Sequence, residues 1–305
     1  MQNKQRRILI TGASGLLGQA LTRTFSENGD EVIPLLRGES DSAGPIWNPN
    51  TGHIDLKEIG ALDAVIHLAG SNIAQGRWSP ERKKIIRNSR IAATQLLSQA
   101  LIELPEKPKT MISASAVGIY GNCGDVTVDE DTPVGQGFLA NLCAQWEAST
   151  QSAEAAGIRV LHARIGVVLD HQGGALKKMS LPFRLGLGGT LGKGAQFMSW
   201  VSLRDVVGMM QFLIDHPALS GPFNLVSPHP VTNLVFTKAL GHALRRPTVL
   251  PLPSFFMRLL FGEMADELFL SSTRAMPRRF LDAGYSFCDP DLALLLKEQV
   301  ASISR

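Results

Sequence analysis

The sequence predicts an α/β protein, built on a doubly wound parallel sheet with a smaller, discontinuous C-terminal lobe. Three observations support this class. Short apolar runs alternate with amphipathic stretches over the first two thirds of the chain, a glycine-rich turn follows the first run, and the pattern becomes irregular after Arg164. Short strands that are apolar throughout are typical of parallel strands covered by helices on both faces.

The expected strands and helices of the first part alternate. The strands are Ile8–Thr11, Glu31–Leu36, Ala64–Leu68, Thr110–Ser115 and Arg159–Arg164. The helices are Ser14–Asn28, Pro80–Leu104 and Phe138–Ala156. Their ends carry the usual signals, with Ser79 before Pro80 at an N-terminus and glycine after Asn28 and Ala156.

The order of these elements predicts two parts. Residues 1–169 are expected to form a nucleotide-binding domain, to which residues 200–226 return through a helix at Leu203–Asp215 and a strand at Pro222–Val226. Residues 170–199 and 227–305 are expected to form a smaller lobe over a substrate. Its helices are expected at Asn233–Leu244, Ser254–Phe261 and Asp289–Ala301, and its glycine-rich segment 186–194 is suited to a close-fitting cover.

Composition excludes several classes of protein. The 30 basic and 27 acidic residues give a net charge of +3, and basic groups such as Arg245-Arg246 are scattered, so no nucleic-acid partner is expected. Three cysteines without a CxxC pair argue against a disulfide framework and against a metal site. No apolar run reaches the ~18–20 residues that span a bilayer, so no membrane partner and a cytoplasmic location are expected.

The glycine-rich turn predicts a dinucleotide site. Residues 8–18 read Ile-Leu-Ile-Thr-Gly-Ala-Ser-Gly-Leu-Leu-Gly, a strand followed by G-x-x-G-x-x-G and a helix. Gly12 permits a tight turn, Gly15 lets the backbone approach a pyrophosphate, and Gly18 lets the helix pack on its strand, as in a Rossmann-type fold. Ser14, Leu16 and Leu17 complete the expected contacts of this turn. A plain tight turn is the alternative.

The end of the second strand indicates which dinucleotide binds. NAD sites usually place a carboxylate there to bind the ribose 2′-hydroxyl. Here the strand ends Leu36-Arg37-Gly38, with no carboxylate before Glu39, and Leu36 and Arg37 are expected to contact the cofactor. Arg37 could pair with a 2′-phosphate, which favours NADP (NADPH) over NAD. An exposed loop arginine is the alternative.

Motifs along the whole chain resemble one known family. Thr11-Gly-x-x-Gly-x-x-Gly18 and Asp63-Ala-Val-Ile-His-Leu-Ala-Gly70 are similar to the extended short-chain dehydrogenases/reductases. The further motifs Asn88-Ser-Arg90, Ser115-Ala-Val-Gly-Ile-Tyr-Gly121, Arg164-Ile-Gly-Val-Val-Leu169 and Pro277-Arg-Arg-Phe-Leu-x-x-Gly284 resemble its poorly characterised "epimerase family" branch. The resemblance implies cofactor contacts from Leu68, Ala69, Gly70, Arg90 and Val168. An outward-facing charge is the alternative for Arg90.

The acid/base residues of the resembled family are incomplete here. That family uses a serine and a Tyr-x-x-x-Lys pair, and no Tyr-x-x-x-Lys occurs in this sequence. Ser115 fits the serine, whereas Leu139 and Cys143 fall in the tyrosine and lysine positions. Tyr120 is the best substitute for the missing tyrosine, and a role in the pocket wall is its alternative. His67 is expected only to pack.

Two functions of different classes follow. The first is an NADP-binding oxidoreductase or nucleotide-sugar epimerase with non-standard acid/base residues, acting on a small molecule. The second is a non-catalytic NADP-binding regulator, which the cell-division-inhibitor label of some relatives suggests. A fold that keeps no cofactor is a third alternative. The resemblance also implies a homodimer formed through the helices at 80–104 and 138–156.

Overall fold

A computed structural model of the chain describes residues 5–38, 44–56 and 58–303. Its centre is an eight-stranded sheet in the order β12-β8-β6-β5-β1-β2-β3-β4. The strands are β1 (Arg7–Thr11), β2 (Glu31–Arg37), β3 (Ile46–Asn48), β4 (His53–Asp55), β5 (Ala64–His67), β6 (Thr110–Ala116), β8 (Arg159–Ile165) and β12 (Gly221–Leu225). All neighbours pair in parallel except β3 and β4. The predicted doubly wound fold class is confirmed.

The strand order creates a crevice beside the first strand. The chain runs outward from β1 through β2 to β3, and then returns to the other side of β1 to build β5, β6, β8 and β12 in turn. At such a reversal the loops after adjacent strands separate, so a ligand can reach the carboxyl ends of the strands. Here the reversal lies between β1 and β5.

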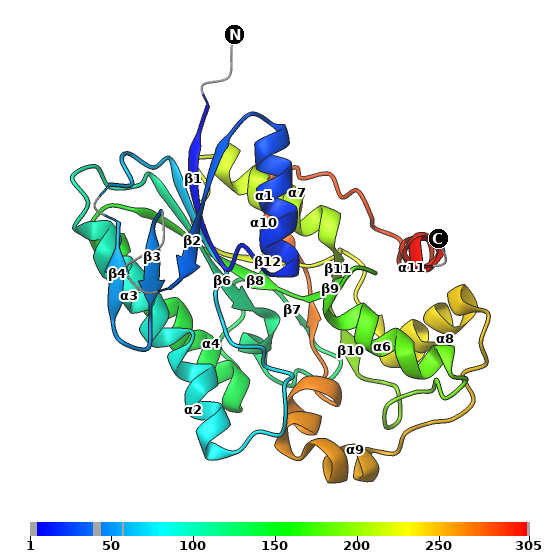
Figure 1. Ribbon diagram of the computed structural model, residues 1–305. Helices are drawn as coiled ribbons and strands as arrows, with labels where there is room; N and C mark the ends of the chain where they lie inside the picture. Colours follow the sequence, from blue (N-terminus) through cyan, green and yellow to red (C-terminus); the bar gives the residue numbers. More distant parts are fainter. Residues whose placement is uncertain (1–4, 39–43, 57, 304–305) are drawn as a thin grey trace.

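Helices cover both faces of the sheet, which explains why central strands such as β1 and β5 are mostly apolar and buried. Ile8 and Ile10 of β1 pack with α1 (Leu16–Glu27) and α7 (Leu203–Asp215), whereas Leu9 packs with α3 (Ile91–Ile102) on the opposite face. Figure 1 shows α1, α7 and α10 (Arg278–Asp282) on one side and α2 (Pro80–Asn88), α3 and α4 (Phe138–Ala148) on the other. Alternate residues of one strand therefore enter two separate cores.

Two predicted helices are broken, which corrects their expected extent. The helix expected at 80–104 divides into α2 and α3 at Ser89 and Arg90, and Ser89 Oγ accepts a hydrogen bond from the Ser71 amide at 3.0 Å. The helix expected at 138–156 divides into α4 and α5 (Gln151–Ala155), where the Thr150 hydroxyl donates to the Glu147 carbonyl. Serine and threonine hydroxyls that bond to nearby backbone compete with the helical pattern.

The C-terminal lobe contains four helices of eight or more residues among the described residues: α6 (Gly174–Arg184), α8 (Asn233–Leu244), α9 (Ser254–Phe261) and α11 (Leu292–Ile303). Helix α6 was not expected, because Gly173, Gly174 and Pro182 mask its pattern. It forms because Leu176 and Phe183 pack in one core with Phe236 and Leu240 of α8.

Pairs of very short strands join the lobe to the main sheet region. They are β9 (Val167–Leu169) with β11 (Trp200–Ser202), β10 (Phe197–Met198) with β13 (Val231–Thr232), and β7 (Thr127–Val128) with β14 (Arg274–Ala275). Strands of two or three residues carry too little pattern to be predicted. A 3₁₀ turn at Val117–Tyr120 and a π-helical turn at Ala265–Phe269 complete the fold. Among the helices described, none has the length and apolarity needed to cross a membrane.

Candidate functional site

The glycine turn follows β1 at the crevice, and its glycines are required by close backbone contacts. Gly12 has φ +72°, and a Cβ on it would lie 3.1 Å from the backbone of Leu68 and Ala69. A Cβ on Gly18 would lie 2.3 Å from the Gly12 carbonyl oxygen, so only glycine lets α1 pack against the turn. Gly15 is the N-cap of α1, whose first turn contains no acidic residue. The helix N-terminus therefore suits an anion.

A cavity of ≈ 510 Å³ lies over this turn. It brings together the turn, the end of β2, one residue of β3 and the segment after β5. Its lining residues are Gly12, Ala13, Ser14, Gly15, Leu35, Leu36, Arg37, Trp47, Leu68, Ala69 and Gly70. Eight of the predicted cofactor residues are thus gathered around one space, although they come from three separate stretches of the chain.

Arg37 is the only basic residue among those that line this cavity. Its side chain is exposed at the end of β2, and within the described part of the chain it forms no hydrogen bond or ion pair. Glu39, the first carboxylate after the strand, lies outside the described residues. Among the described residues nothing neutralises this guanidinium, which can bind a phosphate through paired hydrogen bonds.

Five predicted cofactor residues do not line the cavity. Gly18 is buried beneath the turn, and Leu16, Leu17 and Val168 are partly buried against the main core. The Leu16 side chain also contacts the Gly173–Gly174 turn. Arg90, the fifth, lies behind Gly70. Contacts of these five residues with a cofactor stay a prediction.

His67 supports the cavity wall through a buried hydrogen-bond network. Thr11 Oγ1 accepts from the amides of Leu68 (3.1 Å) and Ala69 (3.2 Å), and it lies 2.7 Å from His67 Nδ1. Because two N–H groups occupy its lone pairs, the Thr11 hydroxyl proton points to Nδ1, and the histidine proton is on Nε2. That nitrogen donates to Thr94 Oγ1 at 3.0 Å.

Burial lowers the pKa of His67 to about 3, so the ring is neutral at physiological pH. Trp146 Nε1 donates to the same Thr94 oxygen at 3.0 Å, which extends the network to α4. The expectation that His67 only packs was therefore incomplete. The ring joins β1 and β5 to α3 and holds the Leu68–Ala69 backbone at the position where it forms the cavity wall.

Arg90 lies directly behind the far end of this wall. Its guanidinium carbon lies 3.3 Å from the position of a Cβ on Gly70 and 5.1 Å from the centroid of the Trp146 ring. One terminal nitrogen donates to the carbonyls of Ser71 (3.1 Å) and Ile86 (3.3 Å). Burial lowers the pKa of Arg90, and no carboxylate pairs with it among the described residues. A cation shielded from water and without a counter-ion favours an anionic ligand nearby.

The two candidate catalytic residues belong to one hydrogen-bond network centred on Arg164. Ser115 Oγ donates to Glu147 Oε1 at 2.7 Å, and Arg164 binds both oxygens of Glu147 at 2.9 Å. Arg164 also donates to the Tyr120 hydroxyl at 3.0 Å, and that hydroxyl donates to Asn224 Oδ1 at 2.7 Å. The structure thus brings Ser115 and Tyr120 together, but within a buried network.

The electrostatics of this network favour a structural role. Burial raises the pKa of Tyr120 to about 12, although the Arg164 charge opposes the shift. Burial also acts to raise the pKa of Glu147, but the Arg164 hydrogen bonds and charge outweigh it and lower that pKa. A neutral phenol and an ionised, paired carboxylate are stable partners rather than groups ready to exchange a proton at neutral pH. Catalysis by Ser115 or Tyr120 stays a prediction.

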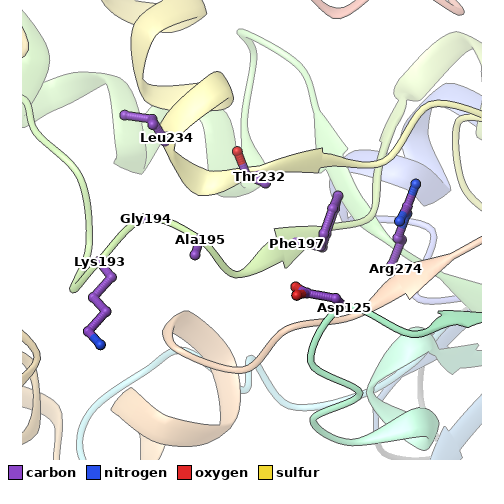
Figure 2. A pocket seen from close by; sticks show the side chains of 8 residues that line it. All are labelled: Asp125, Lys193, Gly194, Ala195, Phe197, Thr232, Leu234 and Arg274. Carbon is purple, nitrogen blue, oxygen red and sulfur yellow. The ribbon is translucent and has the colours of Figure 1, made fainter.

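A second cavity, of ≈ 520 Å³, lies between the lobe and the loop before β7. Figure 2 shows Asp125, Phe197 and Arg274 gathered at one end and Lys193 and Leu234 at the other. The Arg274 guanidinium stacks on the Phe197 ring, 4.7 Å from its centroid. Gly194, Ala195 and Thr232 complete the lining. The lining carries two cations, one carboxylate (Asp125) and an aromatic ring, a surplus of positive charge that suits an anionic ligand with a flat group.

Comparison with known proteins identifies the family. The model of the NAD dependent epimerase/dehydratase family matches residues 8–226. The chain belongs to this epimerase family. A second family model, a domain of unknown function (DUF1731), matches residues 252–299.

Relatives with this family name cover nearly the whole chain. Epimerase family protein Mb2239 of Mycobacterium bovis is 47% identical over 281 residues, which are 92% of this chain and 93% of that one. Epimerase family protein YfhF of Bacillus subtilis is 36% identical, over 96% of this chain and 98% of its own. The crystal structure of human epimerase family protein SDR39U1 with NADPH has a TM-score of 0.86 at 34% identity, covering 97% of this chain and 99% of the human chain.

The positions that hold the family's tyrosine and lysine are occupied by buried, unreactive side chains in this epimerase-family member. Leu139 and Cys143 lie in the interior of α4. Burial raises the pKa of Cys143 to about 12, so its thiol is protonated. A protonated, buried cysteine behaves as a small apolar residue. Among the described residues, no three His, Cys, Asp or Glu side chains gather as a metal site would require.

Sequence reasoning missed several residues that line the cavities. Trp47 comes from a three-residue strand with no recognisable pattern, and it lies edge-on to His67 at 5.8 Å between ring centroids. Arg274 and Phe197 belong to two-residue strands. Lys193 and Gly194 stood in a segment that the sequence singled out, the glycine-rich cover at 186–194.

Proposed function

We propose that the cavity over the glycine turn binds NADP or NADPH. The observation that carries the proposal is Arg37, an unpaired guanidinium on the cavity rim with no described carboxylate beside it. The 2′-phosphate would bind Arg37, the pyrophosphate would lie on the N-terminus of α1, and Trp47 would contact the adenosine half. The human relative crystallised with NADPH supports this choice over NAD.

The residues of the site fit such a group. Gly12 and Gly15 line the cavity without side chains, so the turn presents bare backbone to a ligand. Arg90, behind Gly70, would hold the nicotinamide half through its charge, in place of the missing lysine. When bound, the nicotinamide supplies or accepts a hydride. The chain's own residues bind it, orient it and shield it from water.

The second cavity would hold the substrate. Lys193 and Arg274 are both free of ion pairs among the described residues, and they would bind a phosphate or carboxylate. Phe197, under the Arg274 guanidinium, would contact a flat ring. These groups together match a nucleotide sugar, and the reaction would be an oxidoreduction or an epimerisation with non-standard acid/base residues.

A second candidate, a non-catalytic NADP-binding regulator, is favoured by one observation. Ser115 and Tyr120 both have their hydroxyl hydrogen bonds satisfied within the protein, and Cys143 is protonated in the lysine position. In this case the dinucleotide would only change the population of a partner-binding conformation.

Turnover assays separate the two candidates. The purified chain is incubated with NADPH and a panel of nucleotide sugars and carbonyl compounds, while NADPH absorbance and product composition are followed. An enzyme converts at least one compound, and Arg274→Ala raises its KM. A chain that binds NADPH but converts nothing, with Ser115→Ala and Tyr120→Phe indistinguishable from wild type in binding, supports the regulator.

A further inference from the structure

Two segments of the lobe have an unusual charge. Residues 171–204 and 227–262 contain nine basic residues and no aspartate or glutamate, whereas the rest of the chain has 21 basic and 27 acidic residues. The small net charge of +3 therefore conceals a separation of charge between these two segments and the rest of the chain. Separated charge of one sign produces a field that attracts an oppositely charged surface.

The same segments expose large apolar side chains. They contribute eleven of the seventeen large apolar side chains that are exposed in the described part of the chain. Six of them lie within residues 185–187 and 250–259, and each is 50–67% exposed: Leu185, Leu187, Leu250, Phe255, Phe256 and Leu259. Single exposed leucines need no explanation, but a concentration of this kind marks an interaction surface.

The two segments lie side by side in the fold. The Leu252 amide donates to the Thr190 carbonyl at 2.8 Å, and the Gly192 amide donates back to the Leu252 carbonyl at 2.9 Å. These bonds place the loop after α6 against the segment that leads into α9. Figure 1 shows α6 and α8 side by side at the right and α9 at the bottom, away from the N-terminus. We call the six apolar residues and the cations of these segments the basic apolar face.

Most cations of this face have no acidic partner. Arg204 pairs with Asp289 and Arg258 pairs with Asp266, so those two charges are neutralised. The other seven form no ion pair with any residue that the structure describes. Lys193 lines the second cavity and is not counted in the face. The remaining six are all exposed: Lys177, Lys178, Arg184, Lys238, Arg245 and Arg246. The face therefore combines protruding apolar groups with a surplus of positive charge.

We infer that the basic apolar face binds an anionic membrane surface, with Phe255, Phe256 and the neighbouring leucines inserted between the lipids and the cations on the headgroups. Phenylalanine and leucine next to unpaired lysine and arginine are the composition of interfacial membrane segments. The face would lie on the bilayer, because no described helix can span it. This contact runs against the expectation from composition, which was that the chain has no membrane partner.

Two other occupants fit less well. A second copy of the chain would bring two surplus positive charges face to face, which opposes self-association. A protein partner with a binding groove would use apolar residues that line a depression, but these side chains are half to two thirds exposed and therefore protrude. Protruding apolar groups are suited to a soft, deformable lipid surface.

Vesicle co-sedimentation of the full chain tests the inference. The chain is mixed with vesicles of phosphatidylcholine alone, and with vesicles that also contain phosphatidylglycerol. We expect it to sediment with the anionic vesicles at low salt, to be released by high salt, and to bind phosphatidylcholine vesicles at least tenfold more weakly, since each cation near the surface contributes roughly 1 kcal/mol. No sedimentation with anionic vesicles at low salt would overturn the inference.

Matched variants keep the test specific. Phe255→Ser/Leu259→Ser and Arg184→Gln/Arg246→Gln each remove two groups of the face, and we expect each to weaken binding roughly tenfold. The controls Val126→Ser/Val134→Ser and Arg23→Gln/Lys84→Gln remove exposed groups of the same kinds elsewhere and should bind as wild type. Equal binding by face and control variants would refute the assignment.

Light scattering tests whether a second copy of the chain covers the face. All substituted side chains are exposed, so circular dichroism should show that the variants fold normally. The wild-type chain and Phe255→Ser/Leu259→Ser should have the same mass in solution without vesicles. A dimer that becomes a monomer on this substitution would show that a second copy covers the face, and would overturn the membrane contact.

Discussion

At the scale of single residues, the proposed preference for NADPH rests on Arg37. A carboxylate at this position would repel a 2′-phosphate, whereas a guanidinium without an internal partner loses no existing ion pair when it binds one. The energy of such a charge-assisted contact, about 1.5–3 kcal/mol, is large enough to control the choice between NADPH and NADH.

Replacing this arginine gives the first prediction. Arg37→Ser should weaken NADPH binding roughly 10- to 100-fold and leave NADH binding within about threefold, because only NADPH carries the 2′-phosphate. Isothermal titration calorimetry with both dinucleotides measures the ratio. Arg23→Ser, an exposed arginine on α1, is the control and should change neither affinity. A parallel loss of both affinities would contradict the assignment.

The glycines of the turn give a second prediction. We expect Gly18 to be needed for the stability of the fold and Gly15 for the binding of NADPH. Gly18→Ala places a Cβ 2.3 Å from the Gly12 carbonyl oxygen and should lower the free energy of unfolding by about 2 kcal/mol or more. Gly15→Ala meets its nearest atom at 3.4 Å and has φ −78°, so the fold should tolerate it. It should nevertheless weaken NADPH binding, because the added methyl projects where the pyrophosphate approaches. Urea unfolding and calorimetry on both variants give the two quantities.

Arg90 gives a third prediction, which a ligand fragment makes specific. If Arg90 holds the nicotinamide half, Arg90→Met should weaken NADPH but not 2′-phospho-ADP-ribose, which lacks nicotinamide, and Arg90→Lys should restore part of the affinity. Fluorescence titration with both ligands provides the comparison. An equal loss for the two ligands would show that Arg90 acts only by supporting the Leu68–Gly70 wall.

At the scale of elements, the buried His67 network holds four of them together. Thr11 belongs to β1, His67 to β5, Thr94 to α3 and Trp146 to α4. Each hydrogen bond is formed out of contact with water, where an unsatisfied group costs about 1–3 kcal/mol. The network also explains how a turn made of glycine, which has little intrinsic order, faces a wall of defined position.

The fourth prediction concerns the pH dependence of stability. The folded pKa of His67 is about 3, below its ordinary value of 6.5, so between these pH values the unfolded chain binds a proton that the folded chain does not. The contribution of His67 to the free energy of unfolding is therefore fully present above pH 6.5. It is lost as the pH falls toward 3, by up to about 1.4 kcal/mol per pH unit. His67→Asn should reduce that slope in urea unfolding measured between these values.

The same variant has an internal control. At neutral pH His67→Asn should be less stable than wild type, by about 2–4 kcal/mol for a broken buried network, and the difference should shrink as the pH is lowered. His162, whose pKa is also lowered by burial, should retain its own smaller contribution in both proteins. A constant difference at every pH would mean that His67 is not neutral in the folded chain.

At the scale of the whole molecule, the cofactor cavity is built from segments on both sides of the sheet reversal. NADPH would therefore join the α1 turn, the β2 end and the β5 segment. A ligand that binds only the folded chain stabilises it by about 2.7 kcal/mol at a hundred times its Kd. The chain should therefore be more stable in the presence of NADPH than after NADPH has been removed.

The fifth prediction follows from that linkage. Saturating NADPH should raise Tm by roughly 5 °C, and NADH at the same concentration should raise it less. Differential scanning fluorimetry measures both shifts, and Arg37→Ser should make them similar. No shift with either dinucleotide would favour the reading in which the fold keeps no cofactor.

Much of the sheet was predictable because its signals are local. The apolar runs of β1, β5 and β8, the three glycines and the absence of a carboxylate at the end of β2 are each readable within about ten residues. Local backbone demands of this kind determine residue type directly, since only glycine fits Gly12 and Gly18. The family resemblance added Leu68–Gly70, which does line the cavity.

By itself, then, the sequence determined the fold class, the glycine turn and the lack of Tyr-x-x-x-Lys. Only the tertiary structure decided what the other polar side chains do. It surrounds Tyr120 with Arg164 and Asn224, from strands more than 40 residues away, and it pairs loops of the lobe into one basic apolar face. The reason is physical: a pKa, a hydrogen-bond partner and a shared surface are properties of neighbours in space, and distant segments become neighbours only when the chain folds.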